Sequence, residues 1–360
     1  REKENHITTL QTIKDSIHEQ RIQFRHQNGW THYADAVSLE QMDVLATRYM
    51  DFLSHAKTER ETVDLVVEAL KDAGFSEDFK KDLVFRTYRG KAVFVARKGK
   101  KPLASGVRLI SAHTDAPRLD FKQRPLQEQV GIGQAKTHYY GGIRKYQWAT
   151  IPLAMHGVVI LKDGTSMDIC IGEKEGDPVF CVTDLLPHLA AQQNERKLKD
   201  GIKGEELNII VGSLPYPCEE EDSIKEPVKL LALSILNERF GMTEKDFLRA
   251  EIEFVPAVKA TDVGLDRSLV GAYGQDDKVC AYTALTAEMK AKSPEYTTVT
   301  ILADKEEIGS VGNTGLNSDF TLHYIEGLCK AGNVDVRKVL KHSLCLSLIH
   351  ISEPTRLQLI

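Results

Sequence analysis

Residues 297–313 read TTVTILADKEEIGSVGN, an apolar run rich in β-branched residues that ends in four consecutive charges and a glycine-containing turn. A second run of this kind, GVRLISA at residues 106–112, is followed at once by a histidine and, two residues later, an aspartate. Both runs are short and mostly without alternation, which is typical of central strands covered by helices on both sides. The two runs therefore predict an α/β sheet.

Two helices near the start of the chain carry their own capping signals. Ser38 with Gln41, and Thr58 with Glu61, both fit the capping box in which two side chains satisfy free N–H groups at a helix start. The second helix has valines and a leucine on one face and is expected to end at Gly74. We expect it to lie on the core of the sheet.

The middle of the chain differs in pattern from both ends. Residues 156–173, HGVVILKDGTSMDICIGE, form two β-rich runs around Asp163-Gly164, which predicts a hairpin. We therefore interpret this part of the chain as an inserted β-rich domain that splits the α/β domain in two. The predicted division is 1–122 plus 262–347 for the split domain and 123–261 for the insert.

Composition excludes several classes of protein. The 360 residues carry a formal net charge of −5 and a pI of about 6.2, which gives no general attraction to nucleic acid or to an anionic membrane. Six cysteines without a CxxC pair favour the reducing cytoplasm. The first residues, REKENHITTL, contain no hydrophobic signal core, and the lack of an initiator Met suggests that the native start is missing.

The first polar cluster follows the strand expected at 106–112. His113 and Asp115 come after this strand, at the carboxyl edge where open α/β sheets bind ligands. A loop histidine with an aspartate nearby is the structural alternative. A histidine two residues from a carboxylate also suits a metal ligand that is oriented by its neighbour, and Pro117 stiffens the turn.

Two further clusters contain only acidic side chains. Asp276 and Asp277 are expected in the first turn of a helix, where they could serve as caps or bridge two cations. Glu306 and Glu307 follow the strand at 297–303. In an extended backbone these neighbours would point in opposite directions, one to a metal and one to substrate. The alternative is a solvated loop, and Asp304 and Lys305 are interpreted as ordinary surface charges.

Together, the three clusters supply His, Asp and Glu side chains at the ends of separate core elements, which is the ligand set of a hydrolytic zinc site. Two metals about 3.5–4 Å apart could share Asp276 and activate a water molecule. Glu306 would then be the general base.

Four separated motifs in order carry a resemblance to a known family. They read ISAHTDAPRLDFKQRPL, HYYGGIRKYQWATIPLAMHGVV, DVGLDRSLVGAYGQDDKVCAYTAL and DKEEIGSVGNTG. Over about residues 40–347 the chain resembles the aspartyl aminopeptidase family of metalloaminopeptidases, and more closely its bacterial branch. The resemblance implies a cytoplasmic di-zinc exopeptidase that removes N-terminal, acidic residues from peptides. It further implies a three-layer, zinc-exopeptidase-like catalytic domain, an inserted β-rich dimerisation domain, and a homododecamer built from dimers.

The resemblance also assigns roles to individual residues. The implied metal ligands are His113, Asp276 as the bridging ligand, and Glu307. Asp115 is the implied carboxylate that supports His113, and Glu306 the implied general base. His188, in LLPHLA, lies in a segment that the family uses near subunit contacts, although a histidine beside leucines is more often simply packed.

The chain departs from the family pattern after Ser347. Leu348 and Ile349 stand where the family has an Ala and a ligand Asp, and a distal ligand His is also missing. Residues 348–360, LIHISEPTRLQLI, resemble an artefactual tail. We therefore expect the full-length parent to be active, whereas this chain would bind metal poorly and be nearly inactive.

Two alternatives remain open. One is a related di-zinc aminopeptidase with broader, glutamyl or leucyl specificity, because no Lys or Arg of the motifs can be assigned to bind an acidic side chain. The other is a non-catalytic oligomeric scaffold that has kept the fold. Cobalt or manganese could also replace zinc, since these ions suit the same ligands.

Overall fold

The computed structural model describes residues 28–218 and 224–348. The chain divides into two compact units, Arg1–Tyr49 and Met50–Ile360, and each is described by itself. The described part of the first unit holds helix α2 (Trp30–Tyr33) and the start of helix α3 (Ala36–His55), which continues into the second unit. The candidate site lies within the second unit. Residues 349–360, which include most of the predicted tail, lie outside the described residues.

A five-stranded sheet forms the centre of the α/β part of the second unit. Its strand order is β1 (Leu83–Tyr88), β2 (Ala92–Arg97), β13 (Thr297–Ala303), β3 (Val107–His113) and β14 (Leu344–Ser347). β3 runs parallel to both of its neighbours, β13 and β14, whereas β2 is antiparallel to β13 and to β1. The two apolar runs are therefore adjacent inner strands, as predicted.

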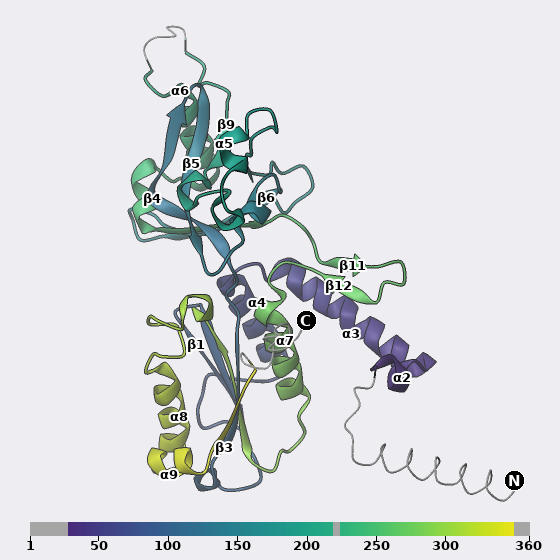
Figure 1. Cartoon of the computed structure of the whole chain (residues 1–360). Helices are drawn as coiled ribbons and strands as arrows, with labels where there is room; N and C mark the ends of the chain where they lie inside the picture. Colours follow the sequence, from purple (N-terminus) through teal and green to yellow (C-terminus); the bar gives the residue numbers. More distant parts are fainter. Residues whose placement is uncertain (1–27, 219–223, 349–360) are drawn as a thin grey trace, which may run out of the picture. The chain divides into compact units, whose positions relative to one another are not determined.

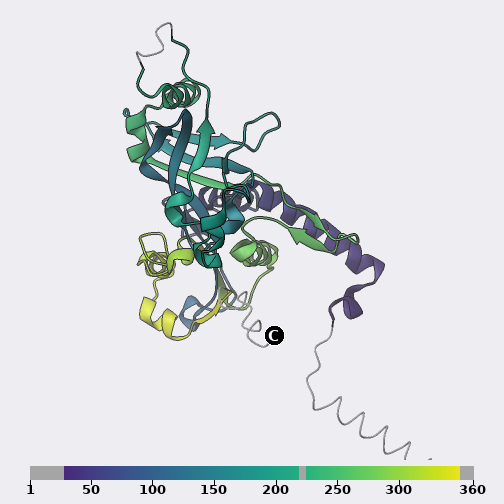
Figure 2. The same cartoon turned by 45° about the horizontal axis from the view of Figure 1, so that its top comes forward.

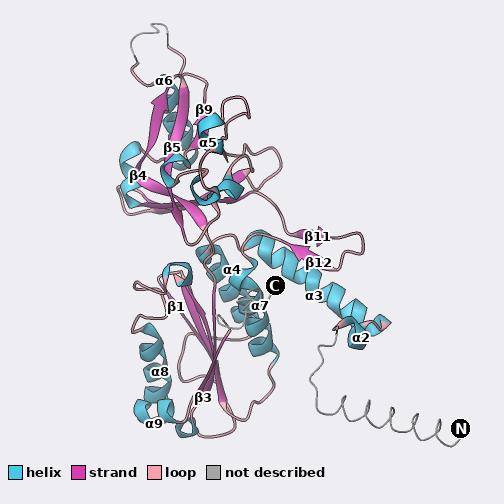
Figure 3. Ribbon diagram, in the orientation of Figure 1, coloured by secondary structure: helices cyan, strands magenta, loops and turns pink. Residues whose placement is uncertain are grey.

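Helices cover both faces of this sheet, so the fold has three layers (Figures 1 and 3). α4 (Glu59–Asp72) and α7 (Gln275–Lys290) lie on one face, and α8 (Phe320–Ala331) and α9 (Val336–Lys341) lie on the other. In β2, Val93 and Val95 pack toward the first helix pair, while Phe94 packs toward the second. Each such buried side chain stabilises the fold by roughly 1.5–3 kcal/mol.

One of the two predicted capping boxes is confirmed. Thr58 precedes α4, the Glu61 N–H donates to its hydroxyl, and the Thr58 N–H donates to the Glu61 carboxylate. The box predicted at Ser38 is wrong, because α3 has already begun at Ala36. The Ser38 N–H instead donates to Asp35, which lies just before the helix.

The second sheet has seven antiparallel strands. Their order is β7 (Ser166–Ile171), β6 (Leu153–Ile160), β10 (Ala250–Pro256), β4 (Arg118–Gln129), β5 (Ile132–Tyr140), β9 (Ile209–Gly212) and β8 (Cys181–Val182). β6 and β7 form the predicted hairpin. The predicted domain division stays a prediction, and its first boundary, 122/123, lies inside β4.

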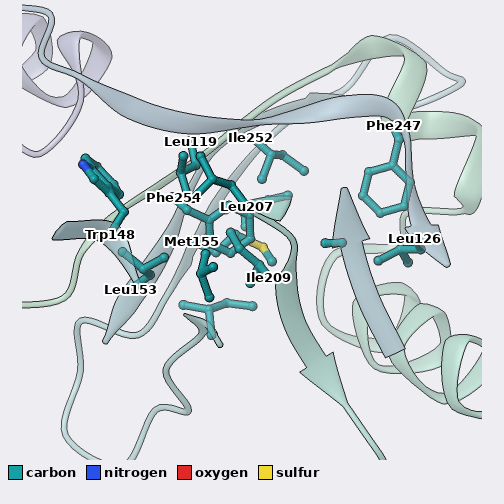
Figure 4. Close-up of a cluster of buried hydrophobic side chains, with 14 of the residues drawn as sticks. Leu119, Leu126, Trp148, Leu153, Met155, Leu207, Ile209, Phe247, Ile252 and Phe254 are labelled. Atoms are coloured by element: carbon teal, nitrogen blue, oxygen red, sulfur yellow. The ribbon is translucent and has the colours of Figure 1, made fainter. Parts of the chain in front are cut away.

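Apolar side chains from this sheet form a core of their own, with Leu119, Phe254 and Ile209 among those fully buried (Figure 4). Helix α6 (Pro227–Phe240) packs against β4, β5 and β9 (Figure 2) and ends at Gly241, whose φ is +68°. The other elements are α5 (Ala191–Asn194), β11 (Thr261–Val263), β12 (Leu269–Gly271) and the short 3₁₀ turns at Leu103–Ser105, Lys145–Trp148, Leu198–Asp200, Gly204–Glu206, Glu244–Arg249 and Glu306–Ile308.

Within residues 28–218 and 224–348, no helix has both the length and the apolar composition that crossing a membrane requires.

Candidate active site

The register between two parallel strands brings the candidate residues together. β13 pairs with β3 so that Ala303 lies opposite His113, the last residue of each strand. Both strands therefore end at the same edge of the sheet, and the residues that follow Ala303 emerge beside His113. This is the carboxyl edge at which open α/β sheets bind ligands.

His113 lies buried at the centre of the cluster. Its Nδ1 is 3.0 Å from the backbone oxygen of Asp115 and 3.3 Å from Asp115 Oδ1. Its Nε2 is 3.4 Å from Asp276 Oδ1 and 3.6 Å from Glu306 Oε2. Burial lowers the pKa of the imidazole, but the hydrogen bond and the negative charges around it outweigh burial and raise the pKa to about 9.

Asp115 is the most heavily hydrogen-bonded member of the cluster. The Tyr140 hydroxyl donates to its Oδ2 at 2.7 Å, and the backbone N–H groups of Glu306 and Glu307 donate to its two oxygens at 3.2 Å each. Burial alone would raise the pKa of this carboxyl, but His113 and Tyr140 favour the charged form and the pKa is lowered. Asp115 therefore stays ionised behind the imidazole.

The predicted extended backbone at Glu306 and Glu307 is wrong, because both residues lie in a 3₁₀ turn. The turn is bracketed by Lys305 at φ +66° and Gly309 at φ +84°, which lets both N–H groups point at Asp115. Gly141, also at positive φ, packs against Glu307 so closely that an added Cβ would lie 3.1 Å from Glu307 Oε2. Burial, opposed by His113 and reinforced by the neighbouring carboxylates, raises the pKa of Glu307 to about 7.

Asp276 and Asp277 precede the regular part of α7. Their φ/ψ angles are not helical, and the peptide bond between them is cis. The Asp276 side chain is 71% exposed, whereas Asp277 is buried and accepts a hydrogen bond from the His113 backbone N–H at 3.4 Å. Only Asp276 therefore presents its carboxylate to the open side of the cluster.

The interpretation of Asp304 as a surface charge is wrong. Its side chain is buried and accepts hydrogen bonds from the Lys305 N–H and from the Thr314 hydroxyl. Burial and the nearby charge of Glu59 raise its pKa to about 6.

The structure brings together five of the six candidate residues: His113, Asp115, Asp276, Glu306 and Glu307. His188 is exposed between β8 and α5, and no contact recorded for the described residues joins it to this cluster.

Sequence reasoning missed Tyr140, whose only signal was its place in the HYYGG motif. It also missed Arg118, which pairs with Tyr140 across two strands.

The donor set fits zinc in its chemistry. Imidazole and carboxylate are zinc ligands, and bond lengths of about 2.0–2.1 Å put two ligands of one tetrahedral ion roughly 3.3–3.4 Å apart. The 3.4 Å between His113 Nε2 and Asp276 Oδ1 matches that separation. Within the described part of the chain, however, no group of three or more His, Cys, Asp or Glu side chains is arranged to hold an ion. The site therefore fits zinc in the type of its donor atoms and in the spacing of one ligand pair, His113 and Asp276.

A buried histidine facing carboxylates at the carboxyl edge of a three-layer sheet is typical of zinc-dependent exopeptidases. The chain belongs to the M18 peptidase family, because the family description "Aminopeptidase I zinc metalloprotease (M18)" matches residues 52–353. It is accordingly a zinc metalloaminopeptidase, a hydrolase.

Known relatives agree with this assignment. The chain is 45% identical over 338 residues to a "Probable M18 family aminopeptidase 1" of Clostridium acetobutylicum, covering 89% of this chain and 71% of the relative. It is similar, with a TM-score of 0.84 and 44% identity, to the crystal structure of an M18 aminopeptidase from Thermotoga maritima, over 90% of this chain and 72% of that one. A structure of the S. cerevisiae mApe1 dodecamer shares the fold at 19% identity, with a TM-score of 0.66 over 85% of this chain and 71% of that one.

Proposed function

We propose that this aminopeptidase uses His113, Asp276 and Glu307 as metal ligands, Asp115 as the carboxylate that orients His113, and Glu306 as the general base. One observation carries the proposal. The imidazole Nε2 of His113 faces both Asp276 Oδ1 at 3.4 Å and Glu306 Oε2 at 3.6 Å. A metal ion held by His113 and Asp276 would therefore lie next to the carboxylate of the proposed base.

When bound, zinc polarises a peptide carbonyl and lowers the pKa of a water molecule toward about 7. The chain's own residues supply the rest of the chemistry. Glu306 Oε2 accepts the proton of the attacking water and returns it to the leaving amine, the general acid–base role. Asp115 fixes the imidazole through Nδ1, which leaves Nε2 free to face the metal.

We propose two zinc ions per subunit, with Asp276 shared between them and cobalt or manganese as possible substitutes. The high exposure of the Asp276 side chain supports this proposal, because a bridging carboxylate must present both of its oxygens. Replacement of Leu348 and Ile349 by the family's Ala and Asp should strengthen the metal site, since we propose that this chain binds metal weakly without that carboxylate.

The preferred N-terminal residue is proposed to be acidic, with a broader or leucyl specificity as the alternative. A panel of aminoacyl chromogenic substrates separates the two. Faster cleavage of an Asp than of a Leu substrate is expected, and a preference for Leu would contradict the acidic assignment.

We also propose that the chain is cytoplasmic and assembles into a homododecamer built from dimers, with His188 at a subunit contact or near substrate. The printed description of the yeast relative as a dodecamer supports the assembly. Leu185, Leu186 and Leu189 are exposed beside His188, an apolar surface that a neighbouring subunit would cover. Light scattering should give the mass of an oligomer, and Leu186→Asp should lower it; a monomeric wild-type chain would contradict the proposal.

Glu306→Gln tests the catalytic role, because the amide cannot accept the proton. In a zinc-loaded, full-length version of the protein the substitution should lower kcat by on the order of 10²–10⁴-fold and leave zinc content and assembly unchanged. Glu68→Gln, at an exposed position of α4, is the matched control. Unchanged turnover in the Glu306 variant would remove Glu306 as the base, and a full-length version without any turnover to lose would favour the scaffold alternative.

A further inference from the structure

Tyr140 links the second sheet to the candidate active site. It is the last residue of β5, its ring is buried, and its hydroxyl donates to Asp115 Oδ2 at 2.7 Å. The two backbone N–H groups that also bind Asp115 are farther away, at 3.2 Å. The shortest hydrogen bond that Asp115 accepts therefore comes from a strand of the seven-stranded sheet.

Arg118 holds the Tyr140 ring in place. The two residues lie directly opposite each other in the β4–β5 ladder, and the guanidinium carbon of Arg118 is 3.9 Å from the centre of the ring. A guanidinium over an aromatic face is attracted by the ring electrons, more strongly where water is excluded. The ring is thus fixed on one face by a buried cation.

Arg118 is itself immobilised by three acidic residues. It is only 5% exposed, and its nitrogens lie 3.2 Å from Glu59 Oε2, 2.8 Å from Asp120 Oδ1 and 3.3 Å from Glu253 Oε1. Glu59 belongs to α4, Asp120 to β4 and Glu253 to β10. These elements together determine where Arg118, and hence the Tyr140 hydroxyl, can lie.

We propose that Tyr140 is a positioning residue of the active site and that Arg118 is its support. The Tyr140 hydroxyl holds the Asp115 carboxylate so that its Oδ1 stays 3.3 Å from His113 Nδ1, which also lies 3.0 Å from the Asp115 backbone oxygen. The alignment of the His113 ring by this carboxylate sets how tightly the site binds a divalent metal. The inference rests on the proposed role of His113 as a metal ligand. Loss of a partner that contacts a metal ligand directly lowers metal affinity by about 10–100-fold in known sites. Tyr140 acts through Asp115, so its effect should lie at the lower end of that range.

Tyr140→Phe removes the hydroxyl and leaves the ring under Arg118. The matched control is Tyr139→Phe, because the neighbouring ring is exposed on the other side of the strand. Co²⁺ affinity, measured by competition with a chromogenic chelator, should fall about 10-fold for Tyr140→Phe and stay unchanged for Tyr139→Phe. Equal Co²⁺ affinity of Tyr140→Phe and the wild-type chain would overturn the proposal.

A second measurement needs neither metal nor turnover. In metal-free protein labelled with [¹⁵N]histidine, the His113 ring signals, assigned with His113→Gln, should shift in Tyr140→Phe and not in Tyr139→Phe. Unmoved His113 signals in Tyr140→Phe would refute the positioning role. If instead Glu306→Gln keeps full activity, the proposed catalytic role of Glu306 fails while this result for Tyr140 stands.

A double-mutant cycle separates positioning from a general loss of stability. In an Asp115→Ala background the Tyr140→Phe substitution should no longer change Co²⁺ affinity, since the side chain that accepts the Tyr140 hydrogen bond is gone. A loss of the same size in both backgrounds would mean that Tyr140 does not act through Asp115, and the inference would fall.

Discussion

His156 makes the stability of this protein depend on pH in a direction that can be worked out from the structure. The side chain lies on β6 and is 2% exposed, with Nδ1 2.7 Å from Glu61 Oε1 and Nε2 3.1 Å from Glu173 Oε1. Glu61 belongs to α4, so the protonated ring joins the helical layer to the seven-stranded sheet. We predict that raising the pH deprotonates His156 and weakens its interactions with Glu61 and Glu173. The substitution His156→Gln should remove the part of the pH dependence of stability that comes from this ring.

The size of the stability change follows from the pKa of the His156 ring. Burial lowers the pKa of His156, but the hydrogen bonds to Glu173 and Glu61 outweigh burial and raise it from 6.5 to about 9. Because the folded pKa lies above the unfolded one, the stabilisation is fully present below pH 6.5 and is lost as the pH rises through about 9. At about 1.4 kcal/mol per pKa unit, the loss across this window is about 3 kcal/mol.

Lys57 and Cys170 are among the other titratable groups near this pair of carboxylates. Lys57 Nζ is 4.0 Å from Glu173 Oε1, and burial lowers the pKa of Lys57, so its own contribution changes with pH in the opposite sense. Cys170 is exposed and lies opposite His156 in the β6–β7 ladder; partial desolvation of its thiol and the charges of Glu61 and Glu173 raise the pKa to about 11. Both residues are present in the wild-type chain and in the variant, so the difference between the two proteins reports chiefly on His156.

Urea unfolding between about pH 6 and pH 9 measures the effect. The fluorescence of Trp148, which is buried in the core of the same sheet, follows the transition, with Trp30 replaced by Phe in every protein. The free energy of unfolding of the wild type, minus that of His156→Gln, should fall by about 3 kcal/mol across the window. His138→Gln, whose histidine side chain is 57% exposed, should behave as the wild type. A difference that stays flat with pH would refute the reasoning.

Two further substitutions test the geometry of the site. Gly141→Ala would place a Cβ 3.1 Å from Glu307 Oε2 at φ +74°, so kcat/KM of a full-length version should fall by about 10²-fold. Gly131→Ala, at φ +70° with no atom within 4 Å, should cost stability without changing turnover. Replacement of Leu348 by Ala and Ile349 by Asp should tighten zinc binding by about tenfold or more, worth about 1.4 kcal/mol. Zinc competition with a chelator that gives equal affinities would argue against a missing carboxylate ligand.

The sequence predicts the central strands and the confirmed cap correctly because each depends on short-range pattern. The runs at 106–112 and 297–303 are apolar and β-branched, and such segments are typical of strands buried between two helical layers. Thr58 and Glu61 are three residues apart, and the side chain of each accepts a hydrogen bond from the backbone N–H of the other, without help from the rest of the chain. Local chemistry was sufficient in these cases.

Predictions failed where a partner from a distant part of the chain or a competing neighbour determines the structure. Asp304 looks like one member of a charge run, but the fold buries it against Thr314. Ser38 resembles a cap, but the helix begins at Ala36, and Asp35, just before it, accepts a hydrogen bond from the Ser38 N–H.

The roles of Tyr140 and Arg118 could not be read from the sequence either. Both roles arise from the register of the β4–β5 ladder, which lies in no single stretch of residues.

The hydrogen bonds of Asp115 also determine when during folding the site can form. Its donors lie 25 residues away at Tyr140 and 191 and 192 residues away at Glu306 and Glu307. Contacts of such long sequence separation close late, because the loop entropy must be overcome first. A nascent chain therefore cannot assemble this site until residue 307 has left the ribosome, which keeps the peptidase inactive up to that point of its synthesis.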